Sequence, residues 1–143
     1  MKFTLSWLKE FVEVDLPPAE LAKALTMAKK KTGDENLPYL VGEMENAFAS
    51  ASLALADMIA AAEAGQPGPE STSRTMIGRQ LAGQGAIRTV ERAMEVAGGA
   101  SFYREPGLER AFRDVQAARF HPLQEKPQLR YTGRVALGWD IDG

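Results

Sequence analysis

The strongest pattern in the sequence is a stripe of apolar residues at steps of four and three along residues 37–62. Such spacing places about one residue per turn on a single face of an α-helix. Gly65 follows the stripe, and Pro67 and Pro69 lie beyond it, where a helix commonly ends. We therefore predict a helix over residues 37–64, roughly 40 Å long. The stripe consists of Leu37, Val41, Met44, Phe48, Ala51, Leu55, Met58 and Ala62.

A second run of helical periodicity follows the proline-rich loop and predicts another long helix over residues 71–97. Its first residues, Ser71 to Ser73, are all suitable N-caps, and Gly98-Gly99 stops the run. The residues expected on its buried side are Ile77, Leu81, Ile87, Val90, Met94 and Ala97.

Three glycines, Gly78, Gly83 and Gly85, lie inside this second helix. Each lowers helix propensity by roughly 1 kcal/mol relative to alanine. We expect them to let another backbone come close. They do not form a nucleotide-binding motif, because Gln84 stands where a P-loop has lysine and Arg88 stands where the third glycine of a dinucleotide fingerprint would fall.

A shorter helix is predicted from Pro18, a proline suited to a first helical turn, to Ala28. Leu21, Ala24 and Leu25 share its apolar stripe with Ala28. The helix ends in Lys29-Lys30-Lys31, positive charges that suit the negative end of a helix dipole. A solvated helix end explains this triplet better than a nucleic-acid patch.

The C-terminal third predicts further short elements. Residues 106–118 predict a helix with two i,i+4 ion pairs, Glu109 with Arg113 and Arg110 with Asp114. Pro122 and Pro127 are expected to break the chain, and residues 129–137 to form a last short helix or an extended tail.

These segments predict an all-α fold, an antiparallel bundle with two long helices (about 37–64 and 71–97) plus shorter helices. Alternating apolar and polar residues, which mark strands, are nearly absent. Because the first long helix is broadly alanine-rich, we expect it to keep an apolar face free for another subunit.

Composition narrows the function further. The chain has 143 residues, a net charge of −2, no cysteine and one histidine. This balance gives no reason to expect nucleic acid or an anionic membrane as a partner, and the absence of cysteine leaves too few ligands for a zinc site. No run approaches the length needed to span a bilayer, and the N-terminus lacks a signal-peptide pattern, so we expect a cytoplasmic protein.

From Leu37 to about residue 138, the chain resembles the C-terminal helical domain of the acyl-CoA dehydrogenase family. The likeness rests on an ordered set of motifs: Arg88-Thr-Val-Glu-Arg-Ala-Met-Glu-Val-Ala-Gly-Gly99, Pro106-Gly-Leu-Glu-Arg-Ala-Phe-Arg-Asp114, His121-Pro-Leu-Gln-Glu-Lys-Pro127 and Tyr131-Thr-Gly-Arg-Val-Ala-Leu-Gly138. The resemblance implies an FAD-dependent oxidoreductase whose bundle builds the oligomer core. It covers about the last third of such a protein, so this chain alone is expected to be incomplete as an enzyme.

The resemblance implies that Glu95, Gly98 and Gly99 form a turn that contacts the FAD bound to a neighbouring subunit. Glycine fits there because it adopts left-handed conformations and lets backbone amides approach a dinucleotide. Glu95 stands where glutamine is usual, and a carboxylate repels pyrophosphate. The alternative is that Gly98-Gly99 is a plain helix stop.

The position of the usual catalytic glutamate is Pro122, which cannot move a proton. The neighbouring His121 is the candidate acid/base, because some related flavin monooxygenases use a histidine near this place and its ordinary pKa is near 6.5. The alternative is a structural histidine at a helix end.

Residues 1–27 resemble a different family, the start of the phenylalanyl-tRNA synthetase β-subunit, without the tRNA-binding fold that should follow. We therefore divide the chain into an N-terminal helical extension, residues 1–31, and the bundle, residues 32–143. Three functions remain open. The chain is a bundle used for self-association or as part of a split flavoprotein, or it contacts FAD in trans beside a partner chain with the missing domains. The third possibility is a structural remnant with no ligand, stabilised only by oligomerisation.

Overall fold

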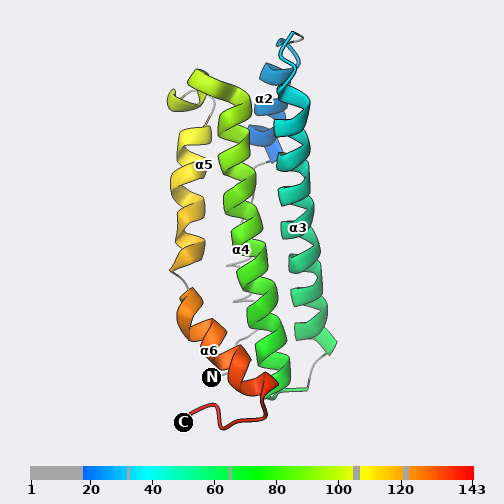
Figure 1. Ribbon diagram of the computed structural model, residues 1–143, viewed down its shortest axis with the longest axis vertical. Helices are drawn as coiled ribbons and strands as arrows, with labels where there is room; N and C mark the ends of the chain where they lie inside the picture. The colour runs from blue at the N-terminus through cyan, green and yellow to red at the C-terminus, as the bar shows by residue number, and fades with distance from the viewer. Residues whose placement is uncertain (1–17, 32, 65, 105–106, 121–122) are drawn as a thin grey trace.

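The two long helices run antiparallel, side by side, in the computed structural model of the chain (Figure 1). The structure describes residues 18–31, 33–64, 66–104, 107–120 and 123–143. Helix α3, Leu37–Ala64, has the predicted bounds. Helix α4, Pro69–Ala97, begins two residues before the prediction because Pro69 fits the first helical turn. The described residues contain no strand, so the all-α prediction is confirmed.

Helix α4 is the centre of the fold, since every other α-helix packs against it. Helix α2, Pro18–Ala28, lies against its C-terminal half, and α5, Leu108–Val115, and α6, Glu125–Ala136, follow its other side (Figure 1). One buried cluster joins α2, α3, α4 and α5 near the end of α4, and a second joins α4 to α5. The first contains Ala24, Ala28, Met44, Ala93, Val96, Ala97 and Leu108; the second contains Ala86, Ile87, Val90 and Val115.

Glycines bring α3 and α4 unusually close together, as expected from the sequence. A Cβ atom added to Gly78 would lie 2.7 Å from the Cβ atom of Met58. One added to Gly85 would lie 2.9 Å from both the backbone nitrogen and the Cβ atom of Ala51. These separations are well below van der Waals contact, so no side chain fits at either glycine without moving α3.

The buried side of α4 was predicted correctly in its second half and wrongly in its first half. Ile87, Val90 and Ala97 are buried, whereas Ile77 is 38% and Leu81 is 51% exposed. The reason is that α3 packs on the small residues of α4, and Gly78 and Gly85 lie on the face that meets it. The larger side chains at 77 and 81 therefore stay partly exposed beside this contact.

The short elements differ from prediction mainly at their ends. The ion pairs Arg113–Glu109 and Arg110–Asp114 both form on α5, which ends earlier than predicted and passes into the 3-10 helix η2, Gln116–Arg119. The prediction that Pro127 breaks the chain is wrong, because Pro127 lies in the first turn of α6, where a helix does not need its N–H.

Helix α3 is long and apolar enough, by length and composition, to cross a membrane. The expectation that no run approaches that length is therefore wrong. The finding is weak evidence for a membrane span, because the core helices of soluble proteins meet the same criterion. Only 17% of its most apolar window is buried within the structure.

Candidate functional site

The Gly98-Gly99 turn lies where α4 ends, at the end of the bundle where α3 begins. Gly98 has a φ of 64° and a ψ of −142°, a conformation that L-residues rarely adopt. Its N–H donates to the carbonyl oxygens of Met94 and Glu95, and the chain continues as the 3-10 helix η1, Gly98–Phe102. Glycine at position 98 is thus required by the backbone. Gly99 has a negative φ and nothing within 4 Å of an added Cβ, so open space adjoins it.

Lys31 reaches this turn from the end of α2. Its Nζ donates to the carbonyl oxygens of Val96 at 3.1 Å and Ala97 at 3.4 Å. Helix α4 has no basic residue in its own last turn, so Lys31 supplies the positive charge that the helix end favours. An ammonium has three donor hydrogens, which leaves one beside Gly98. From the sequence, Lys31 was expected to interact with the end of its own helix, α2. In the structure its ammonium instead bonds the end of α4.

The carboxylate of Glu95 is ion-paired within the chain. Arg92 donates to both of its oxygens at 2.7 and 2.8 Å and also pairs with Glu43 on α3 at 2.9 Å. The hydrogen bond with Glu95 is the main cause that raises the pKa of Arg92 above its ordinary value. Because the one guanidinium is shared between Glu95 and Glu43, the cluster of three side chains keeps a net charge of −1 near this turn.

These features fit a flavin nucleotide that approaches the turn from outside. Gly99 offers accessible backbone, Lys31 offers an ammonium, and Glu95 is paired. Gly99 and Lys31 would hold the phosphate-bearing part of such a molecule, since the N–H of Gly98 is already bonded within the helix end. The redox chemistry would be that of the flavin, and the described residues here would contribute binding only.

A second candidate place lies about 15 residues back along α4, roughly 22 Å from the turn. There η2 comes so close to α4 that a Cβ added to Gly83 would lie 3.2 Å from the Cβ atom of Ala118. His121 and Pro122 lie outside the described residues. Of the described residues on either side, Ala118 contacts Gly83, and the carbonyl oxygens of Ala118 and Leu123 accept hydrogen bonds from Arg79.

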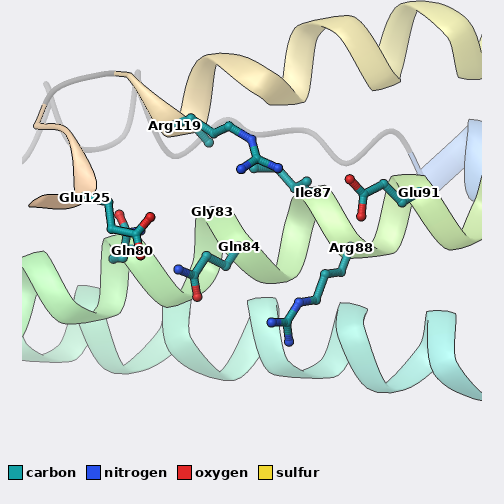
Figure 2. A pocket seen from close by; sticks show the side chains of 9 residues that line it. Gln80, Gly83, Gln84, Ile87, Arg88, Glu91, Arg119 and Glu125 are labelled. Atoms are coloured by element: carbon teal, nitrogen blue, oxygen red, sulfur yellow. The ribbon is translucent and has the colours of Figure 1, made fainter.

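A groove of about 370 Å³ opens at this second place, between α4, η2 and the start of α6 (Figure 2). Ile87 and Gly83 form part of its floor, and arginine, glutamate and glutamine side chains surround it. No motif marks this site in the sequence, because its residues come from three separate segments. Within the described part of the chain, no cluster of three or more His, Asp or Glu side chains could hold a metal ion.

The described residues define the class of the fold, an antiparallel α-helical bundle whose central helix ends in a Gly-Gly turn. A family model described as "Acyl-CoA dehydrogenase, C-terminal domain" matches residues 19–125, which are 107 of the 143 residues. The chain therefore belongs to this family, and the predicted resemblance is confirmed. The match begins inside residues 1–31, and the domain division placed there stays a prediction.

No curated protein and no solved structure matches the chain. The comparisons give no support to the likeness of residues 1–27 to the phenylalanyl-tRNA synthetase β-subunit, and most of that segment lies outside the described residues.

Proposed function

We propose that this chain is an assembly domain of an acyl-CoA dehydrogenase-type protein, and that two copies associate through the outer face of α3. One observation carries the proposal: α3 is apolar around most of its circumference, yet only 17% of its most apolar window is buried. A helix that is apolar all round is normally buried on all sides. Among the described elements, α3 packs extensively only against α4.

The outer face of α3 has a shape that suits a second helix. Ala49, Leu53, Ala56 and Ala60 follow one another at steps of four, three and four, so they share the face opposite the buried Met58. All four are exposed, and Leu53 is 72% exposed. Small residues around a central leucine allow two helices to pack closely, with each leucine against the partner's alanines.

A second copy fits this face better than a lipid bilayer. Asp57 lies on α3 and is ion-paired with Arg74 at 2.5 Å, and both side chains are exposed. Glu63 lies on the same helix, near its C-terminal end. Ionised groups at membrane depth cost several kcal/mol, whereas the same groups at the rim of a protein interface remain in water.

Sedimentation velocity of wild-type protein and of Leu53→Glu tests the proposal. We expect a dimer or larger assembly that dissociates in the variant. Burial of a leucine contributes about 1.5–3 kcal/mol, and a two-fold interface contains two, so the dissociation constant should rise at least about a hundredfold. Leu129→Glu on α6 is the matched control, because Leu129 is also exposed but lies on another helix. A wild-type monomer at high concentration would contradict the proposal.

A second function, contact with FAD in trans, is favoured by the paired state of Glu95 and by Lys31 beside Gly98. A flavin-fluorescence titration tests it. We expect saturable binding that approaches one flavin per chain and is lost in Gly99→Val. Gly133→Val is the matched control and should still bind flavin. Neither substitution meets a neighbouring atom, because both glycines have nothing within 4 Å of an added Cβ atom. Without binding, the turn is a helix stop only. Flavin and substrate domains on a partner would supply the remaining parts of such a site.

A further inference from the structure

The exposed residues on the outer face of α3 have a symmetric order along the helix. Ala49, Leu53, Ala56 and Ala60 follow one another at steps of four, three and four, and this series of steps reads the same in both directions. When the helix is turned end over end, position 49 therefore falls on position 60, and position 53 falls on position 56. The outer two positions exchange alanine for alanine, and the inner two exchange a large side chain for a small one.

This order has different consequences for the two directions in which two copies of α3 can pair. In a parallel pair each residue meets its own copy, so Leu53 meets Leu53 and the neighbouring layers contain only alanine. In an antiparallel pair with position 49 beside position 60, Leu53 of each copy meets Ala56 of the other. The same residues are buried in both pairs, and only the distribution of the large side chains differs.

The antiparallel pair has the more even layers. Helix axes lie about 8–10 Å apart, depending on the side chains at the contact. Two leucines in one layer hold the axes of a parallel pair apart, so the alanine layers beside them leave voids and lose dispersion contacts. One leucine and one alanine in each middle layer allow a single, shorter separation along the helix. Leu53 is 72% exposed and fills no layer within its own chain.

The polar residues at the ends of this face favour the same direction. Asn46 lies three residues before Ala49, and Glu63 lies three residues after Ala60, so both continue the series, and both are exposed. A parallel pair places Glu63 beside Glu63 of the other copy, and like charges brought together across an interface are unfavourable. The antiparallel pair places Glu63 beside Asn46, whose side-chain amide can donate to a carboxylate.

We propose that two copies of the chain pair antiparallel along α3, with the two-fold axis between positions 53 and 56 and Leu53 of each copy against Ala56 of the other. This inference rests on the proposed assembly through α3 and adds the direction and the register of the pair. Both copies use the same surface, so the pair is closed and does not extend into a filament.

Disulfide cross-linking tests the direction, because the chain has no cysteine of its own. We expect Ala49→Cys and Ala60→Cys chains, mixed in equal amounts and mildly oxidised, to form disulfide-linked dimers on a non-reducing gel. Each variant alone should give about tenfold less, because identical positions of the antiparallel pair lie eleven residues, or roughly 16 Å, apart along the helix. A disulfide spans Cα atoms up to about 7 Å apart. Leu129→Cys, exposed on α6, mixed with Ala60→Cys measures cross-linking by random collision.

Sedimentation of the reduced samples separates a wrong direction from a missing assembly. If the protein sediments as a dimer but Ala60→Cys cross-links with itself as well as with Ala49→Cys, the antiparallel direction is wrong and the assembly stands. The direction is also wrong if a dimeric mixture cross-links no better than the Leu129→Cys control. If wild type is a monomer at high concentration, the assembly itself fails, and the direction fails with it.

Discussion

The close contact of α3 and α4 predicts that alanine at position 85 destabilises the protein, although alanine is the better helix former. The new Cβ atom would lie 2.9 Å from the Cβ atom and backbone nitrogen of Ala51 and 3.0 Å from its Cα atom. These distances are up to about 1 Å shorter than favourable contact, and backbone atoms cannot rotate away. Helix α3 must therefore move, which also disturbs the contact at Gly78.

The magnitude follows from two opposed effects. Overpacking of a close contact costs about 1–3 kcal/mol, and replacing glycine by alanine inside a helix returns about 1 kcal/mol. We expect Gly85→Ala to lower the free energy of unfolding by about 1 kcal/mol. Gly133→Ala, in α6 with nothing within 4 Å of the new methyl group, should raise it by up to about 1 kcal/mol. The same substitution thus has opposite signs at the two positions.

Thermal unfolding followed by circular dichroism measures this difference. About 2 kcal/mol between the variants corresponds to roughly 6 °C in Tm for a chain of this size. All samples need one protein concentration, because self-association raises apparent stability. In the double variant Gly78→Ala with Gly85→Ala, the loss should be smaller than the sum of the two single losses, since a single displacement of α3 relieves both contacts. Equal Tm values for Gly85→Ala and Gly133→Ala would refute the close packing.

Three further outcomes are expected. Lys31→Met should destabilise the chain by about 1–2 kcal/mol in urea unfolding, because it leaves carbonyls at the end of α4 without their charged donor, while Lys30→Met should change stability by less than about 0.5 kcal/mol. Gly98→Ala should cost about 1–2 kcal/mol, because its φ is positive; an unchanged midpoint would contradict that backbone conformation. The hydrogen bond from Arg74 lowers the pKa of Asp57, so this carboxylate contributes stability above its ordinary pKa of 3.8 that is lost as pH falls through the lower folded value. Asp57→Asn should therefore flatten the loss of stability in an acid titration.

The long helices were predictable because their periodicity is strong, and the bounds of α3 agree with the sequence pattern. The packing face of α4 was harder to predict. Ile77 and Leu81 have the spacing of a buried stripe, yet α3 selects the face that allows the closest approach. Gly78 and Gly85, seven residues apart, indicated the face of α4 that packs on α3 better than Ile77 and Leu81 did. For two long helices, the small residues identified the contact more reliably than the large apolar ones.

The candidate sites show the limit of local sequence reasoning. That the helix ends before Gly98 follows from the Gly-Gly pair itself. The contact of Lys31 with this helix end does not, because 65 residues separate it from Val96 and three adjacent lysines are equivalent in the sequence. The packing of α2 on α4 determines that Lys31, the third of these lysines, makes the contact. Arg79 was missed for the same reason, since its partners are main-chain carbonyls of a distant segment.

The unequal surroundings of the two long helices explain why α3, rather than α4, should meet another subunit. Helix α4 has α3 on one side, α2 along its C-terminal half, and α5 and α6 on another side. None of these described elements extends over the outer face of α3. Close packing at Gly78 and Gly85 buries one strip of α3 and leaves Leu53 on the opposite strip. If Gly85→Ala shifts α3 but leaves its outer face intact, the variant should have a lower Tm than wild type. Its oligomeric state at low temperature should be the same as that of wild type. A variant that lost both properties together would mean that the position of α3 on α4 also shapes the outer face.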